Sequence, residues 1–143
     1  MENLQGRFAV VTGGTFGIGR GIAGELANRG VRVFVTGRSV RQGAPADDNI
    51  TPIRCDHRLD PEVTAAFGTI AGLTPGIDIL VNNVWGGYER MVEGGAFTWG
   101  KPFWEQPLWR WDAMFSAGVR AHYHASQLAA PAMVAHPGDS VRR

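Results

Sequence analysis

Short apolar runs alternate along this chain with longer stretches in which apolar residues recur at helical spacing. The runs at 8–11, 31–35, 51–55 and 77–81 are the length of strands, and 31–35 is rich in the β-branched residues typical of buried strands. The periodic stretches at about 18–30, 60–72 and 108–135 predict helices. Strands that alternate with helices predict an α/β fold with a parallel sheet.

The first strand leads into a glycine-rich turn, with glycines at positions 13, 14, 17 and 19. Gly13 would let the chain turn off the strand, Gly17 would let the backbone approach a phosphate, and Gly19 would let the helix pack close to the sheet. The N–H groups at the start of the helix would then face the anion. A tight turn without a ligand also uses glycine, but the order strand, turn, helix favours a dinucleotide-binding Rossmann half.

The composition of the chain limits the functions that can be expected of it. The chain has 143 residues, of which 44% are hydrophobic and 19% are charged, as in a single folded domain with a core. A net charge of +1 gives no electrostatic reason to expect nucleic-acid binding. One cysteine, Cys55, allows no intrachain disulfide, and we expect it to be buried. With neither a signal-peptide pattern nor a long apolar run, a cytoplasmic location without a membrane span is expected.

Two arginines indicate which dinucleotide would bind. An acidic residue about 20 positions after the glycine turn would hold the ribose 2′-OH of NAD, but Arg38 stands there. Arg20 directly follows the last glycine of the turn. Two guanidinium groups beside the ribose would neutralise a 2′-phosphate, which predicts NADP rather than NAD. The alternative is that both are solvated surface side chains.

The segment Thr12-Gly-Gly-Thr-Phe-Gly-Ile-Gly19 resembles the Thr-Gly-x-x-x-Gly-x-Gly fingerprint of the short-chain dehydrogenase/reductase family. The order of the parts resembles this family from Leu4 to about Val134. Within it, the stretches 81–83, 103–107, 111–112 and 118–123 resemble the branch that contains dehydrogenase/reductase SDR family member 1. The resemblance implies hydride transfer between a nicotinamide and a carbonyl or alcohol.

The resemblance also implies roles for individual residues. Asp56 would contact the adenine edge, although it could equally cap a turn after a strand, and Asn83 would lie near the ribose. His57 is expected at the surface. The complete set of expected cofactor-binding residues is Gly13, Thr15, Gly17, Ile18, Gly19, Arg20, Arg38, Asp56 and Asn83. No metal site is expected, because His122 and His124 do not share a helix face.

Residues 84–107 form a long, aromatic-rich connection punctuated by glycines. All five tryptophans lie between positions 85 and 111. The segment could be a substrate lid or pocket wall, which would favour a bulky apolar substrate, or a satellite cluster on the sheet edge. The helix at 108–135 carries small residues on one face, and in the resembling family it often builds a dimer interface, so we expect a homo-oligomer.

The catalytic residues of the family are not recognisable here. Its active site uses Asn, Ser, Tyr and Lys, and Gly118 stands at the usual Asn position. Neither Tyr88 nor Tyr123 has a lysine four positions later, and Lys101 is the only lysine. We therefore expect a cofactor-binding half with four strands in the order 3-2-1-4 over residues 1–135, and a polar tail over 136–143. The alternatives are a non-catalytic dinucleotide-binding or subunit-pairing module, and an inactive truncated fragment.

Overall fold

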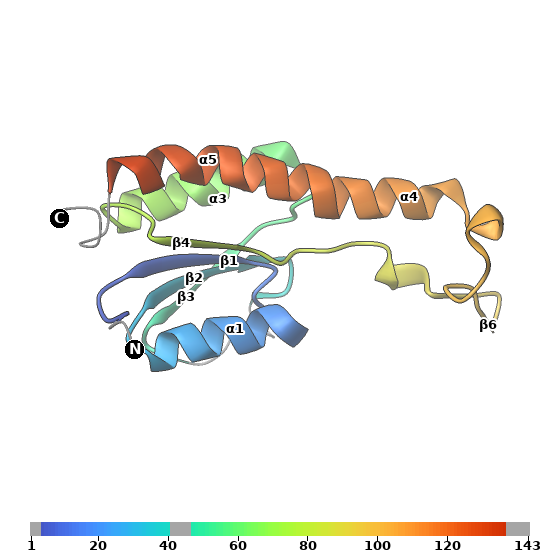
Figure 1. The fold of residues 1–143 in the computed structure, drawn as a ribbon, viewed down its shortest axis with the longest axis horizontal. Coiled ribbons are helices and arrows are strands. Elements are labelled where there is room, and N and C mark those ends of the chain that lie inside the picture. Colours follow the sequence, from blue (N-terminus) through green and yellow to red (C-terminus); the bar gives the residue numbers. More distant parts are fainter. Residues whose placement is uncertain (1–3, 41–46, 137–143) are drawn as a thin grey trace.

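A computed structural model describes residues 4–40 and 47–136, and its centre is a parallel sheet (Figure 1). The strands are β1 (Phe8–Thr12), β2 (Arg32–Gly37), β3 (Ile50–Arg54) and β4 (Ile79–Asn82). Their order is β3-β2-β1-β4, which confirms the predicted fold class and strand order. Residues 41–46, and the predicted tail beyond residue 136, lie outside the described residues.

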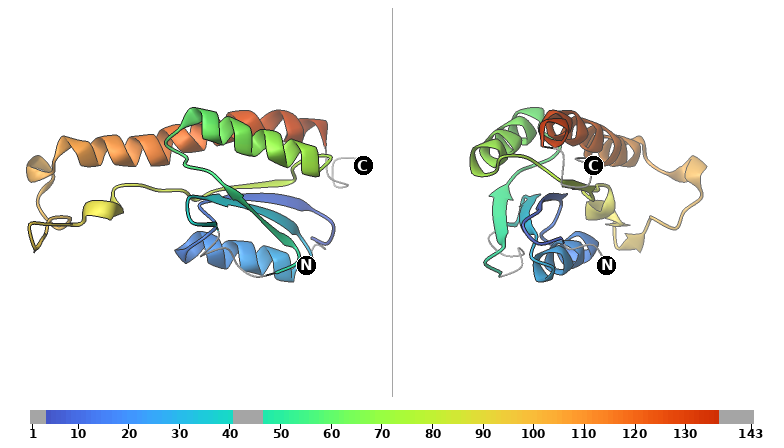
Figure 2. Two further views of the ribbon diagram at one scale, coloured as in Figure 1. Left: turned by 180° about the vertical axis from the view of Figure 1, so that it is seen from behind. Right: turned by 60° about the vertical axis from the view of Figure 1, so that its left-hand side comes forward.

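Alternating side chains of the strands fill two separate cores. Val10 faces the layer of α3 (Asp60–Leu73) and α5 (Ala121–Ala135), whereas Ala9 and Val11 face α1 (Gly17–Asn28). Figures 1 and 2 show α1 on one side of the sheet and the α3–α5 pair on the other. Burial of both sheet faces explains why the strands are apolar runs rather than alternating patterns.

The helix at 108–135 changes its winding part of the way along. It comprises α4 (Leu108–Met114), a π-helical segment η3 (Phe115–Arg120) and α5. A π-helix takes more residues per turn than an α-helix, so the predicted single apolar face is broken. Ala125 and Ala129 are buried against α3 and the sheet, whereas Trp111 and Phe115 are exposed. The small residues of α5 therefore pack against α3 of the same chain.

Between β4 and α4 the chain leaves the sheet as an extended arm, here called the aromatic arm (residues 84–107). It contains two 3-10 turns, η1 (Tyr88–Arg90) and η2 (Phe103–Glu105), and a small hairpin of β5 (Val92–Glu93) and β6 (Ala96–Phe97). Figure 1 shows the arm running beyond the carboxyl ends of the strands rather than packing on the sheet edge. Within the described residues, no helix has the length and apolar character needed to cross a membrane.

Candidate functional site

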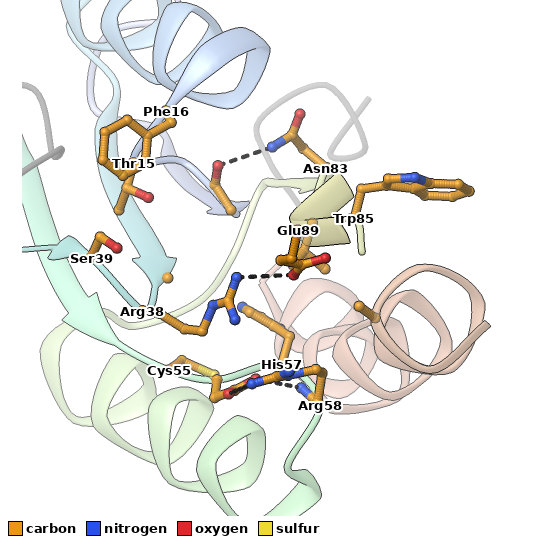
Figure 3. A pocket seen from close by; sticks show the side chains of 15 residues that line it. Thr15, Phe16, Arg38, Ser39, Cys55, His57, Arg58, Asn83, Trp85 and Glu89 are labelled. Atoms are coloured by element: carbon orange, nitrogen blue, oxygen red, sulfur yellow. Dashed lines mark hydrogen bonds and ion pairs between the residues drawn. The ribbon is translucent and has the colours of Figure 1, made fainter. Parts of the chain in front are cut away.

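A hollow of about 180 Å³ lies where the strands end and the aromatic arm begins (Figure 3). In an open parallel sheet, this carboxyl edge is where ligands bind. The glycine turn, the ends of β2 and β3, and the segment after β4 all contribute to its wall. The lining includes five of the expected cofactor-binding residues, namely Gly13, Thr15, Arg38, Asp56 and Asn83.

The glycine turn has the backbone geometry that the sequence suggested. Gly13 and Gly17 have φ angles of +69° and +54°, a region that favours glycine. Nothing lies within 4 Å of the place where a Cβ of Gly17 would be, so its backbone is open to a ligand. A Cβ on Gly19 would instead overlap the side-chain amide of Asn83, so only glycine lets α1 begin this close to β4.

Asn83 holds the turn in place. Its side-chain Nδ2 donates to the carbonyl oxygens of Thr12 and Gly13 at 3.1 and 3.0 Å, and its backbone N–H donates to Thr12 Oγ1 at 3.0 Å. These bonds tie the end of β4 to the end of β1 across the site. Because these bonds join residues about 70 positions apart, the sequence around Asn83 carries no direct signal for this clamp.

The other residues of the turn either line the hollow or are exposed to solvent. Thr15 is buried against Gly37 and lines the hollow, whereas Ile18 is exposed on the first turn of α1. Phe16 also lines the hollow and is more than half exposed, a contribution that the sequence did not indicate. An exposed aromatic ring at this position offers a flat apolar surface to a ligand.

The structure brings Arg38 to the hollow but leaves Arg20 exposed, outside the lining residues. Arg38 Nη2 donates to Glu89 Oε1 of η1 at 3.2 Å (Figure 3). A second arginine, Arg58, lies across the hollow and was not foreseen. The only available signal was its place three residues beyond the third strand, and such a position does not fix where a long side chain points.

Asp56 is engaged by Arg58 rather than free. The backbone N–H and guanidinium of Arg58 donate to its carboxylate at 2.6–3.0 Å. These side-chain hydrogen bonds lower the pKa of Asp56 from 3.8 to about 2. Asp56 therefore caps a turn, the alternative that the sequence left open, while still lining the hollow. The neighbouring Cys55 is buried, as expected, and this burial raises the pKa of its thiol to about 12.

The expectation that His57 lies at the surface was wrong. Its side chain is 4% exposed, and its Nε2 lies 2.8 Å from Thr36 Oγ1 at the end of β2. Burial lowers the pKa of His57 to about 4, so the ring is neutral near pH 7. A polar ring is tolerated there because the strand-end hydroxyl of Thr36 is its hydrogen-bond partner.

Gly118 leaves room for an indole ring. A Cβ at Gly118 would lie 2.8 Å from Cζ3 of Trp85, a separation that real Cβ atoms do not show. Trp85 and Ala117 both line the hollow, so the π segment η3 forms part of its wall. In addition, His122 Nε2 lies 2.7 Å from the carbonyl oxygen of Val84, which fixes the start of the aromatic arm to α5.

The aromatic arm folds around a buried cation, Arg110. This side chain is 4% exposed, and it donates to the carbonyl oxygens of Thr98 and Arg90 at 3.3 Å and to Gln106 Oε1. Its guanidinium also lies 5.0–5.1 Å from the ring centres of Trp99 and Trp109. A second hollow, of about 510 Å³, opens beside it between Trp99, Phe103, Leu108, Trp111 and Met114.

The first hollow combines part of the glycine turn with two arginines and an exposed aromatic ring, and no tyrosine or lysine lines it. Neither Tyr88, Tyr123 nor Lys101 is among the residues that line it. Within the two described ranges, no group of three or more His, Cys, Asp or Glu side chains is arranged to hold a metal ion. The chemistry available here is therefore anion and ring binding.

Comparison with known proteins identifies the family. The sequence matches the family model described as short chain dehydrogenase over residues 7–141. It is 34% identical to human dehydrogenase/reductase SDR family member 1 over 139 residues, which is 92% of this chain and 43% of that protein. The chain thus spans less than half the length of this curated relative.

Solved structures support the same assignment. Ligand-free aldohexose dehydrogenase from Thermoplasma acidophilum superposes with a TM-score of 0.73 at 26% identity, over 93% of this chain and 46% of that one. An NADP active-site complex of Pseudomonas aeruginosa RhlG gives a TM-score of 0.72 at 26% identity, over 92% and 51% of the two chains. The fold, the glycine turn and the match over residues 7–141 together show that the chain belongs to the short-chain dehydrogenase/reductase family.

Proposed function

We propose that this chain is the NADP-binding part of a short-chain oxidoreductase that transfers hydride between the nicotinamide and a carbonyl or alcohol. The observation that carries the proposal is the open glycine turn at the carboxyl edge of the sheet, held by Asn83 and flanked by two arginines. Residues 1–135 are the proposed cofactor-binding unit. When bound, the cofactor supplies or accepts the hydride, and the residues described here bind and orient it.

The cofactor-binding roles follow the layout of the hollow. Gly13, Gly17 and Gly19 shape the pyrophosphate site, with a hydroxyl from Thr15 and the backbone of Ile18. Arg38 faces the 2′-phosphate, and Arg20, in the first turn of α1, approaches the same phosphate. Asp56 borders the adenine, and Asn83 borders the ribose. The support for NADP over NAD is an arginine, and no carboxylate, at the end of β2.

The substrate side is proposed to be apolar. Trp85 borders the cofactor hollow, and the second hollow of the aromatic arm has a mainly aromatic and aliphatic wall. A bulky apolar carbonyl or alcohol fits such a surface. The exposed apolar side chains along residues 108–123 support self-association through this helix.

In the sequence given, neither tyrosine is followed four positions later by a lysine, so the Tyr-x-x-x-Lys pair of the family is not found in it. A second candidate function is therefore a non-catalytic module that binds a dinucleotide or pairs with another subunit. It is favoured by the absence of a tyrosine or lysine from the hollow lining. NADPH consumption with a panel of aldehydes and ketones tests this second candidate, because turnover above a buffer blank would exclude the non-catalytic module.

Substitution of Arg38 tests the cofactor preference. Arg38→Ala removes a charge-assisted contact to phosphate, which contributes about 1.5–3 kcal/mol, so NADPH should bind roughly 10- to 100-fold more weakly. NADH, which lacks the 2′-phosphate, should bind almost unchanged. The measurement is isothermal titration of both cofactors. Arg32→Ala is the matched control, since Arg32 is exposed at the opposite end of β2. An equal loss of both cofactors would contradict a role for Arg38 at the 2′-phosphate.

A further inference from the structure

Arg38 already has an anionic partner in the ligand-free chain. Its Nη2 lies 3.2 Å from Oε1 of Glu89, and the exposed fractions of the two side chains are 49% and 45%. The other carboxylate oxygen of Glu89 accepts a hydrogen bond from the backbone N–H of Gly87 at 2.9 Å. Figure 3 shows the pair spanning the hollow from the end of β2 to η1. A ligand phosphate that needs Arg38 therefore meets a carboxylate already in place.

The second ion pair of the hollow is of a different kind. Asp56 is only 8% exposed and accepts three hydrogen bonds from Arg58, whereas the Arg38–Glu89 pair is a single contact open to solvent. The charged side chains that line the hollow are these two arginines and two carboxylates, so their formal charges cancel. A phosphate dianion would therefore bind more favourably if one carboxylate moved away, and Glu89 is the more weakly held of the two.

Glu89 also stands at the base of the aromatic arm. Its neighbour Tyr88 has its ring centre 5.1 Å from that of Trp99. Its other neighbour, Arg90, places its guanidinium carbon 4.4 Å from the ring centre of Trp109. The Arg38–Glu89 pair ties η1 to the end of β2, so breaking it would free η1, whose side chains contact Trp99 of the arm and Trp109 of α4.

We propose that Glu89 is an exchangeable counter-ion that competes with the cofactor's 2′-phosphate for Arg38, and that its displacement changes the packing of the aromatic arm. Glu89 thereby becomes a determinant of cofactor specificity and couples the cofactor hollow to the apolar arm. This inference rests on the proposed function.

Elementary electrostatics supports an exchange. A half-exposed ion pair with one contact contributes little to stability, because water screens it and both side chains lose freedom. A phosphate can instead accept two hydrogen bonds from the same guanidinium. The carboxylate of Glu89 would repel the incoming dianion for as long as it stays nearby. Neutralising Glu89 should therefore strengthen binding only of ligands that carry the 2′-phosphate.

Two small probes isolate this contact from the rest of the cofactor. Adenosine 2′,5′-bisphosphate carries the 2′-phosphate, and adenosine 5′-monophosphate does not. Glu89→Gln keeps an acceptor for the Gly87 N–H and removes the charge. We expect it to lower the dissociation constant of the bisphosphate about 3- to 10-fold, the range of a partly screened charge contact, and to leave that of the monophosphate unchanged. Glu105→Gln is the matched control, since it removes the same charge from the aromatic arm away from the hollow lining.

Intrinsic fluorescence reports on the second half of the proposal, because all five tryptophans lie between positions 85 and 111. In the wild type, the bisphosphate should change the emission spectrum more than the monophosphate does at equal saturation. In Glu89→Gln, the spectrum of the free chain should already be shifted toward that of the bisphosphate complex.

The outcomes separate this inference from the function on which it rests. If the wild type binds the bisphosphate more tightly than the monophosphate, and Glu89→Gln changes neither constant, competition by Glu89 is refuted while the NADP preference stands. If binding changes as expected but the spectra do not, the coupling to the arm is refuted. If the wild type binds neither probe, or both equally, the proposed NADP preference fails together with this inference.

Discussion

At the scale of single residues, His57 shows how burial sets the charge state of a side chain that lines the first hollow. The ring is 4% exposed, and burial lowers its pKa from 6.5 to about 4. A protonated ring would need hydrogen-bond acceptors at both nitrogens, and Nδ1 has none within the residues that the structure describes. The fold therefore favours the neutral ring, and protonation favours the unfolded chain.

This preference predicts an acid-sensitive stability. Above pH 6.5 the ring is neutral in both the folded and the unfolded chain, so the free energy of unfolding has its full value. As the pH falls from about 6.5 to about 4, the unfolded chain takes up the proton first, so the free energy of unfolding should fall by on the order of 3 kcal/mol. Urea titrations across this pH range measure it. His57→Gln should flatten the profile in this window, and an unchanged slope in the variant would assign the loss to other groups.

Some residues of the site could be predicted from the sequence, and others could not. Gly13, Gly17 and Gly19 were identifiable because a strand-to-helix turn over a phosphate needs positive φ angles at the first two positions and close packing at the third. Asn83 and Glu89 are different, because they meet their partners Gly13 and Arg38 only through tertiary structure. The residues next to them in the sequence carry no signal for contacts made 70 and 51 positions away. The error on His57 has the same cause, since its burial depends on where β2 ends.

At the scale of elements, the helix at 108–135 is adapted to the aromatic arm. The π segment η3 places Gly118 against the Trp85 ring, at the point where the arm leaves β4. π segments interrupt a helix at some cost and are often found at functional sites. Here the segment brings Ala117 to the first hollow and leaves room for the indole of Trp85, which also lines that hollow. Simple 3.6-residue periodicity could not predict this interruption.

A methyl group at Gly118 tests this fit. In Gly118→Ala the new Cβ would lie 2.8 Å from Trp85, so the ring must move, and crowding of this kind costs about 1–3 kcal/mol. Gly21→Ala is the control, because no atom lies within 4 Å of its Cβ position in α1, and better helix propensity should stabilise it by up to about 1 kcal/mol. Urea unfolding and tryptophan emission measure both. Equal stabilisation of the two variants, with unchanged emission, would show that Trp85 does not need this glycine.

At the scale of the whole molecule, a layered sheet carries a long projection (Figure 2), and several large apolar side chains of this projection are exposed. The layers follow directly from the sequence pattern, because buried parallel strands and amphipathic helices have few ways to pack. The aromatic arm does not, since its fold depends on one buried arginine, Arg110, and the indole rings around it. Aromatic composition indicated a cluster there but not that it would project from the carboxyl edge of the sheet.

The exposed apolar side chains predict how copies of the chain meet. Trp111, Phe115, Val119 and Tyr123 follow one another at spacings of four along the helix, and each is at least 41% exposed. Burying them against a second copy would remove apolar surface from water at about 25 cal/mol per Å². Val119→Glu would place an unpaired charge in that interface and should lower the association constant by at least tenfold, as measured by sedimentation velocity.

The control is Val134→Glu, because Val134 is also an exposed valine but lies near the end of α5. This variant should leave association unchanged. If both variants associate like the wild type, or if the wild type is monomeric at all concentrations, this face of the helix does not join two copies.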